Sequence, residues 1–428
     1  MLPQWFRFNV STRAVGKLAG SAAVAQLIVI GAAPFLTRLY SPAELGVLAF
    51  FLALVGPAAL LGTGGYAQAV VPVQSDRKSL ELVGFAITLC AIVSISLLVG
   101  IFVGASLGLF DRVLLSWIWW LPVAAFIAGA NQMLVSYANR KQQYGLMSWT
   151  TIVRSAVASL TQVALGVFFP SPQSLIGGST AGSLSANVRL TRNWIGDARA
   201  SGVSLFGTIS AARLYARFPR FTLPAGLLSQ ANLAGLPIAI GIIFGPSTLG
   251  LWSIAQRVVA TPLSIVGDAV GAVYFRRAVF AQHSRSASMG LYRKVLFRLF
   301  LLSLIPFVAI SVLAPELFQI VFGPEWRVAG TYAQVMIPWL WIRFLVSPLS
   351  RVTLVYKKNR LGLLLQGVLV TLTAIVVLAA WAYDWEFLLF LSYLSWVMAA
   401  GYFSLLIVYT GVVSKGHSGD AAQDRTQT

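Results

Sequence analysis

The sequence is poor in charged side chains and in the residues that build disulfides and metal sites. Only 10% of its 428 residues are charged, 12 of them are acidic, and it holds one cysteine, Cys90, and two histidines, His283 and His417. A single cysteine excludes an intrachain disulfide and a cysteine-based metal site, and two distant histidines do not suggest a zinc centre. We therefore expect no metal and no other cofactor.

Apolar residues fill the chain instead. They make up 58% of it, with a mean hydropathy of +0.80, whereas soluble globular proteins carry about 25% charged residues. The formal charge of +19 would suggest a nucleic-acid partner in a soluble protein. Here the basic residues lie almost entirely between hydrophobic segments, so no nucleic acid is expected. The composition predicts an all-α polytopic membrane protein.

Long uncharged stretches recur along the chain. A helix needs roughly 20 mainly apolar residues to cross a hydrocarbon core about 30 Å thick. Prolines at 170, 172 and 246 divide two of the longer stretches, because proline ends a helix. About twelve transmembrane helices are predicted, at residues 17–37, 46–71, 82–106, 114–137, 147–169, 174–188, 222–244, 248–272, 297–319, 331–350, 361–383 and 387–411. The segment 174–188 is the weakest, since it is short and rich in Gly and Ser.

The distribution of basic residues orients these spans. Loops on the side of the N-terminus hold 25 Lys and Arg residues and the opposite loops hold three, Arg38, Arg112 and Arg327. Cytoplasmic loops carry the excess of Lys and Arg. We therefore expect a multi-pass protein of the bacterial inner membrane with both termini in the cytoplasm. The first apolar run continues into Pro34 and Arg38, which favours a retained anchor over a cleaved signal.

The predicted helices fall into two pseudo-symmetric halves of six around a central cavity. Residues 1–190 and 222–411 form the halves, joined by a basic cytoplasmic linker at 191–221 and followed by a polar cytoplasmic tail at 412–428. Residues 42–46 and 246–250 both read Pro-x-x-Leu-Gly at the equivalent outer turn, which favours duplication. In the linker, 205–220 alternates basic and apolar residues with helical spacing. It fits either an amphipathic helix on the membrane surface or an ordinary basic loop.

Four sequence blocks carry a family resemblance. They are Pro-Phe-Leu-Thr-Arg-Leu-Tyr-Ser-Pro at 34–42, Ala-Gln-Arg-Val at 255–258, Phe-Gly-Pro-Glu-Trp-Arg-Val-Ala-Gly-Thr-Tyr at 322–332 and Ser-Pro-Leu-Ser at 347–350. With them the chain resembles the O-antigen-type polysaccharide flippases of the multidrug/oligosaccharidyl-lipid/polysaccharide exporter superfamily. Many such proteins carry Arg-Tyr-Glu late in the second helix, where this chain has Gly65-Tyr66-Ala67. Roles of those two charges therefore cannot be carried over.

Three arginines lie within predicted spans. An ionisable residue at mid-membrane costs at least about 2.5–3.5 kcal/mol, so it usually faces a cavity or a partner. Arg154, Arg257 and Arg343 have no acidic residue at the same depth, because Asp268 lies near the inner end of its helix. Their guanidinium groups suit bidentate binding of a phosphate, although each could instead reach the interface with its long side chain. Gln26 and Tyr66 are the polar residues expected to extend this substrate-binding lining.

These features leave three kinds of function open. The resemblance implies a flippase that moves an undecaprenyl-diphosphate-linked oligosaccharide to the outer leaflet by alternating access. Its partners would be that lipid-linked oligosaccharide, the bilayer and other membrane proteins of polysaccharide assembly. A cation-coupled multidrug exporter of the same superfamily would favour acidic residues in the spans, which are almost absent. A polysaccharide polymerase or ligase would need a long external loop, so a non-enzymatic role is expected. The chain has no G-x-x-x-x-G-K-[ST] loop for ATP.

Overall fold

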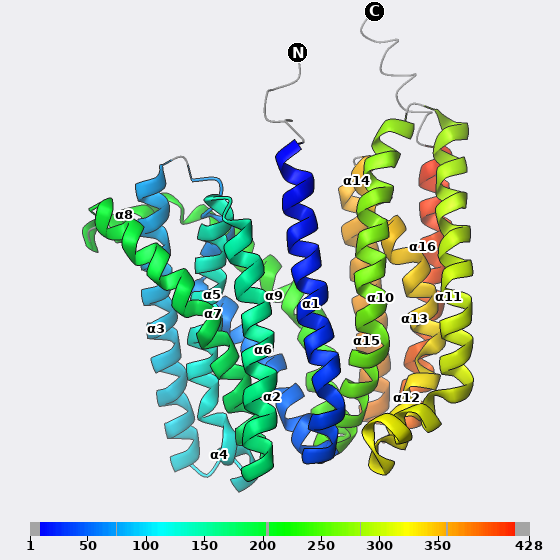
Figure 1. The fold of residues 1–428 in the computed structure, drawn as a ribbon, viewed down its shortest axis with the longest axis horizontal. Coiled ribbons are helices and arrows are strands. Elements are labelled where there is room, and N and C mark those ends of the chain that lie inside the picture. The colour runs from blue at the N-terminus through cyan, green and yellow to red at the C-terminus, as the bar shows by residue number, and fades with distance from the viewer. Residues whose placement is uncertain (1–8, 74, 203–204, 283, 357, 416–428) are drawn as a thin grey trace, which may run out of the picture. The chain divides into compact units, whose positions relative to one another are not determined.

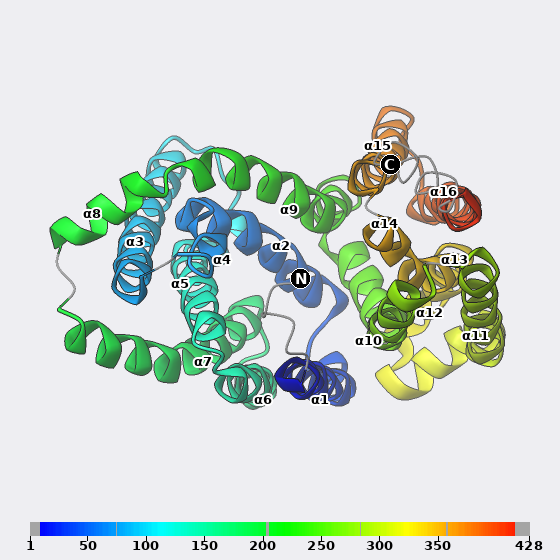
Figure 2. The same cartoon turned by 90° about the horizontal axis from the view of Figure 1, so that it is seen from above.

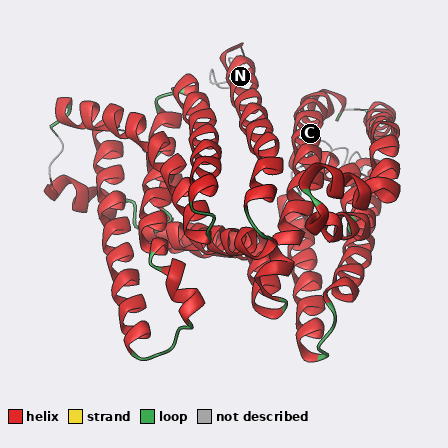
Figure 3. Cartoon of the chain, turned by 60° about the horizontal axis from the view of Figure 1, so that its bottom comes forward, coloured by secondary structure: helices red, strands yellow, loops and turns green. Residues whose placement is uncertain are grey.

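The computed structural model describes residues 9–415 except 74, 203–204, 283 and 357. Every regular element in this described part is a helix, as Figure 3 shows. The predicted all-α architecture is thereby confirmed. His283, His417 and most of the predicted tail lie outside the described residues.

The chain forms two compact units, Met1–Gly250 and Leu251–Thr428. In the first unit long helices run side by side (Figures 1 and 2), and α6 lies between α1 and α7 while α5 contacts α2, α3 and α7. Its elements are α1 (Asn9–Leu39), α2 (Pro42–Thr63), η1 (Tyr66–Gln68), α3 (Asp76–Ser106), α4 (Arg112–Ile118), α5 (Trp120–Arg140), α6 (Tyr144–Phe168), α7 (Pro172–Ala200), α8 (Leu205–Leu214), α9 (Arg217–Ile243) and the start of α10 (Gly245–Ala281).

In the second unit α13 packs between α11 and α16, and α15 packs against α16. After α10 its elements are α11 (Arg285–Phe322), η2 (Pro324–Trp326), α12 (Arg327–Val335), α13 (Ile337–Val346), η3 (Ser347–Arg351), α14 (Val352–Val355), α15 (Asn359–Ala382) and α16 (Phe387–Lys415). The boundary between the units falls within α10. Helix α9, which the sequence analysis assigned to the second half, packs along α2 in the first unit (Figure 2). The division into six-helix halves stays a prediction.

Each of the twelve predicted spans corresponds to helical structure. Ten helices in the described residues are long and apolar enough to cross a membrane, or eleven if one bent pair counts as a single span. That pair, Pro324–Val335 and Ile337–Val355, bends by 52°, and Pro338 in the first turn of α13 offers no N–H to the preceding turn. The remaining predicted span, at 174–188, lies in α7, which is 29 residues long but falls short of that hydropathy threshold.

Hydrogen bonds to neighbouring helices satisfy polar groups in the middle of helix α7. Its Asn187 accepts a 2.6 Å hydrogen bond from Asn131 of α5 and donates one of 2.8 Å to the carbonyl of Ile127. Gln162 of α6 donates to the carbonyl of Leu175 at 2.9 Å. Interhelical hydrogen bonds of this kind hold polar helices inside membrane bundles. The helix therefore belongs in the bundle despite its low hydropathy.

The second predicted span, 46–71, is wrong at both ends. Helix α2 begins at Pro42, where Ser41 and Glu44 form a reciprocal capping box: the Glu44 carboxylate accepts the Ser41 N–H at 2.8 Å. It ends at Thr63 because Gly64 and Gly65 both adopt positive φ, +56° and +75°, a conformation that glycine allows and that terminates helices. The chain then makes the short η1 turn that carries Tyr66.

The predicted linker at 191–221 is mostly helical. Helix α7 continues to Ala200, α8 spans Leu205–Leu214 and α9 starts at Arg217. Helix α8 packs against α3, burying Ala211 and Ala212 and leaving Arg213 exposed. Of the three arginines in 205–220, only Arg213 lies on α8, while Arg217 and Arg220 lie on α9. An amphipathic helix on the membrane surface stays a prediction.

Candidate functional site: an arginine pocket in the second unit

A small pocket of about 160 Å³ lies between α10 and α13 in the second unit. It contains Arg343, one of the three arginines predicted to bind substrate, and one acidic residue, Asp268. Apolar and small side chains make up the rest of its wall. The lining residues are Ala260, Leu263, Ser264, Gly267, Asp268, Leu340, Arg343, Phe344 and Ser347.

Packing on the other side of α13 holds the Arg343 backbone in place. Trp341 donates its indole N–H to the Ser303 hydroxyl at 2.9 Å, and its ring stacks against Phe300 and Phe307 of α11. On α16, the Ser395 hydroxyl accepts the backbone N–H of Trp339 at 3.3 Å. A binding group is positioned best when its own helix is fixed by such contacts.

A second arginine lies at the edge of the pocket. The Nη2 atom of Arg351, in η3, is 4.0 Å from a carboxylate oxygen of Asp268. The chain approaches closely here because Gly271 has no side chain: a Cβ at that position would lie 3.0 Å from Arg351 Nε and 3.3 Å from Pro348 Cα. The Asp268 side chain is 81% exposed and that of Arg351 is 35% exposed, so this ion pair is weak and open to exchange.

The position of Asp268 corrects one expectation from the sequence, that Arg343 has no acidic residue near it. Arg343 was expected to have no acidic residue at its depth, yet Asp268 lines the same pocket. The pocket and its edge therefore carry two arginines and one aspartate, a formal excess of one positive charge. Arg351 was counted only as a loop cation. Its signal in the sequence is its position directly after the Ser-Pro-Leu-Ser block that follows Arg343 by four residues.

The other two predicted arginines lie outside this pocket. Arg257 is half-buried on α10, one turn before the lining residue Ala260, and is not itself part of the wall. Arg154 is exposed on α6, in the first unit. The structure thus brings Arg343 together with Asp268 and Arg351, and a cavity shared by all three predicted arginines stays a prediction.

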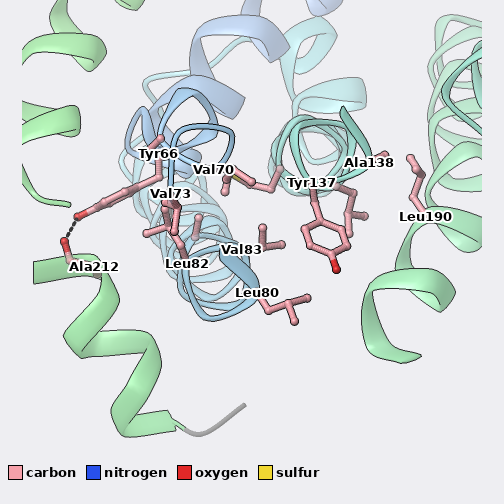
Figure 4. Close-up of a cluster of buried hydrophobic side chains, with 14 residues drawn as sticks. Tyr66, Val70, Val73, Leu80, Leu82, Val83, Tyr137, Ala138, Leu190 and Ala212 are labelled. Atoms are coloured by element: carbon pink, nitrogen blue, oxygen red, sulfur yellow. Dashed lines mark hydrogen bonds between the residues drawn. The ribbon is translucent and has the colours of Figure 1, made fainter. Parts of the chain in front are cut away.

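Tyr66 lies in a packed core of the first unit, shown in Figure 4. It is 7% exposed, its ring meets Phe85 edge to face at 5.5 Å, and its hydroxyl donates to the carbonyl of Ala212 at 3.1 Å. Burial raises the pKa of Tyr66, so the hydroxyl stays neutral and keeps its proton for this bond. In this conformation Tyr66 ties η1 to α8. Gln26, the other predicted polar residue, is half-buried on α1.

No group of three or more His, Cys, Asp or Glu side chains suited to a metal ion occurs among the described residues. Cys90 is buried and forms no disulfide. The chemistry of the pocket is therefore that of guanidinium, carboxylate and hydroxyl groups. Such a set can bind an anion by charge and hydrogen bonds.

Comparison with known proteins identifies a family that this chain matches. Residues 35–330 match the polysaccharide biosynthesis protein family. The amylovoran biosynthesis protein AmsL of Erwinia amylovora is 24% identical over 117 residues, a match that covers 27% of this chain and 30% of that protein. The chain thus aligns with less than a third of that relative's length.

Solved structures show the same fold. A multidrug resistance MATE family transporter of the MOP superfamily in an inward-facing conformation gives a TM-score of 0.69 at 12% identity, over 93% of this chain and 99% of that one. The lipid II flippase MurJ in an inward closed conformation gives 0.73 at 11% identity, over 93% and 89%. The resemblance seen in the sequence is confirmed: the chain belongs to the polysaccharide biosynthesis protein family and has the fold of MOP-superfamily transporters.

Proposed function

We propose that this protein moves an undecaprenyl-diphosphate-linked oligosaccharide from the inner to the outer leaflet of a bacterial inner membrane, for assembly of a surface polysaccharide. The observation that carries the proposal is the pocket lined by Arg343 and the exposed Asp268, with Arg351 at 4.0 Å from that aspartate. The family match supports a role in polysaccharide biosynthesis. A related fold belongs to a lipid II flippase, which makes a lipid-linked sugar a reasonable cargo.

The pocket chemistry suits a diphosphate. Phosphate oxygens form short, charge-assisted hydrogen bonds with guanidinium groups, which bind them bidentately. Asp268 pairs weakly with Arg351, and a diphosphate, which has more negative charge, would displace it from Arg351 and bind Arg343 as well. At about 160 Å³ the pocket would hold the anionic group only. The polyprenyl tail would stay in lipid, since each buried methylene gains about 0.8 kcal/mol there.

The remaining predicted residues take supporting roles in this proposal. Arg257, one turn from the pocket wall, and Arg154, on α6, would contact the anion or an acidic sugar in other stages of alternating access. Gln26 would offer hydrogen bonds to sugar hydroxyls. Tyr66 would bind substrate only after releasing the Ala212 carbonyl, so the proposal does not depend on it.

The location of basic residues in the first unit supports a cytoplasmic N-terminus. The start of α3, with Arg77 and Lys78, and the end of α5, with Arg140 and Lys141, lie at one end of that unit, joined by an Arg140–Asp76 ion pair of 2.9 Å. The C-terminal end of α1 and the start of α4 lie at the opposite end and carry one arginine each, Arg38 and Arg112 (Figure 1). The positive-inside rule assigns the basic end to the cytoplasm.

One observation favours a second candidate. Asp268 is a carboxylate in a predicted span, the kind of group that a cation-coupled multidrug exporter uses to hold a proton, a sodium ion or a cationic drug. The adjacent arginines oppose that use, because positive charge at short range repels a cation. The flippase proposal therefore explains more of the pocket.

A complementation assay tests the proposal. Cells lacking the protein would receive the wild type, Arg343→Ala, Arg343→Lys or the control Arg327→Ala, which alters an exposed ion pair with Glu316 at the opposite end of the unit. We expect Arg343→Ala to block surface polysaccharide and to leave the lipid-linked precursor in the inner leaflet, Arg343→Lys to act partially, and Arg327→Ala to export normally. Normal export by correctly inserted Arg343→Ala would contradict the anion-binding role.

A further inference from the structure

A second concave surface lies on α7, in the first unit, away from the arginine pocket. It is a groove of about 650 Å³ formed along the last four turns of the helix. Its wall combines the apolar side chains of Leu184, Val188 and Ile195 with the guanidinium groups of Arg192 and Arg199. Leu184 is 52% and Val188 is 63% exposed, so the apolar part has no protein cover within the unit.

The groove faces away from the packed side of α7. Leu190 belongs to the buried core of the unit, and Trp194 lies where a side chain at Gly84 of α3 would meet it. At about 100° per residue, Val188 and Ile195 lie about 100–160° around the helix axis from these two. In Figure 2 α7 runs along the edge of the first unit. The groove therefore opens outward from this unit.

The groove carries positive charge that no nearby acid offsets. Among the described residues neither Arg192 nor Arg199 forms an ion pair or hydrogen bond. The acid of the same helix, Asp197, is on the packed side and accepts a 2.6 Å hydrogen bond from Tyr137. An arginine pair beside exposed apolar side chains is complementary to a ligand with an anionic head and a hydrocarbon tail.

The spacing along the helix matches one leaflet of a bilayer. Val188 and Arg199 are eleven residues apart, about 16 Å along the axis, which is about half of a hydrocarbon core 30 Å thick. The arginines lie toward the end of α7 that carries the basic residues, the end assigned above to the cytoplasm. A head group at the arginines would thus place its acyl chain along Val188 and Leu184.

We propose that this groove binds an anionic phospholipid of the inner leaflet. A sugar-bearing ligand is a poorer match, since the groove offers few free neutral hydrogen-bonding groups: Asn187 is already bonded to Asn131 and Ile127. The bound lipid would compensate the charge that α7 brings into the membrane. This inference does not depend on what the protein transports.

Lipid binding to the purified full-length protein tests the proposal. Native mass spectrometry and thermal stability would be measured with phosphatidylglycerol and with phosphatidylcholine. We expect the wild type to retain phosphatidylglycerol and to gain thermal stability from it. The double variant Arg192→Gln/Arg199→Gln should bind it about 10- to 30-fold more weakly. The control Arg189→Gln, exposed on the same helix but outside the groove, should bind like the wild type.

Other results would overturn it. Equal loss in Arg189→Gln would show a general effect of surface charge, and binding that inorganic phosphate abolishes would show a phosphate site with no lipid contribution. Retention of a polyprenyl diphosphate with no retention of phosphatidylglycerol would make the groove part of the substrate path. The stability of the double variant in phosphatidylcholine is the folding control and should equal that of the wild type. A second variant, Leu184→Ser/Val188→Ser, weakens contact with the lipid tail while keeping both arginines.

Discussion

Gly46 and Gly250 lie against each other's helical turns, each where the other leaves no room for a side chain. A Cβ at Gly46 would overlap the carbonyl oxygen of Pro246, and a Cβ at Gly250 would overlap that of Pro42. The two Pro-x-x-Leu-Gly turns noticed in the sequence thus meet in a reciprocal contact in the first unit. Reciprocity of this kind is expected of duplicated elements related by a pseudo-two-fold axis, and it fixes the start of α10 to the start of α2.

Gly46→Ala should therefore destabilise the protein. Forcing a methyl group against backbone atoms costs about 1–3 kcal/mol, and backbone cannot move aside as a flexible side chain can. Thermal unfolding of purified protein in detergent would measure the loss. Gly100→Ala on α3, where a Cβ meets nothing within 4 Å, is the matched control and should be neutral or stabilising by up to about 1 kcal/mol. Equal stability of the two variants would refute the close contact.

Asp268→Asn should strengthen anion binding at the arginine pocket. Removing the carboxylate takes a competing negative charge away from the pocket, and an exposed ion pair such as Asp268–Arg351 contributes about 0–1 kcal/mol. Pyrophosphate binding to purified protein, followed by calorimetry, should tighten by up to about fivefold. Arg343→Ala removes a charged hydrogen-bond donor of about 1.5–3 kcal/mol and should weaken binding at least about tenfold. If Asp268→Asn instead leaves pyrophosphate binding unchanged and abolishes transport of cationic compounds, the exporter is the better assignment.

Arg140→Ala should destabilise the first unit more than Lys141→Ala. Both side chains pair with Asp76 at 2.9 Å, but only Arg140 also donates to the carbonyls of Val70, Val71 and Val73. Without the Arg140 guanidinium these carbonyls lose their donor, and each buried acceptor left unpaired destabilises the fold by about 1–3 kcal/mol. Lys141 contributes an exposed pair of about 0–1 kcal/mol. Denaturation of the two purified variants compares them, and similar midpoints would contradict a structural role for the carbonyl contacts.

Cysteine labelling checks the orientation. In a Cys90→Ala background, Ser284→Cys at the start of α11 should react with an impermeant maleimide only after the membrane is opened. Tyr383→Cys, which follows α15 and is 75% exposed in the wild type, should react in intact cells. The basis is the positive-inside distribution of Lys and Arg. Labelling of residue 284 from outside would reverse the topology.

Hydropathy was enough to predict the long helices, because it depends on long stretches of chain. The points where helices end or bend were harder to predict from the sequence. The end of α2 depends on two glycines with positive φ, Gly64 and Gly65, whereas apolar residues continue past them to position 71. The break at Met336 likewise lies within a continuous apolar run and follows from Pro338.

The candidate site was less predictable than the fold. Arg343 stood out because it is a charge in an apolar segment, but its neighbours come from elsewhere in the chain: Asp268 is 75 residues earlier, and Arg351 lies beyond the bend into η3. Such proximity depends on how α10 and α13 pack. For Tyr66, the sequence does not show that its hydroxyl donates to the carbonyl of Ala212 on α8, and its lining role stays a prediction.

The polarity of α7 has a consequence for biogenesis. A helix below the hydropathy threshold does not partition from the translocon into lipid on its own. Its hydrogen-bond donors are Gln162 of α6 and Asn131 of α5. Both helices precede α7 in the chain and are synthesised before it. Membrane insertion of α7 should therefore wait for these partners and proceed as a hairpin with α6. A nascent chain carrying Asn131→Leu and Gln162→Leu would then translocate residues 172–200 into the periplasm and invert every helix that follows.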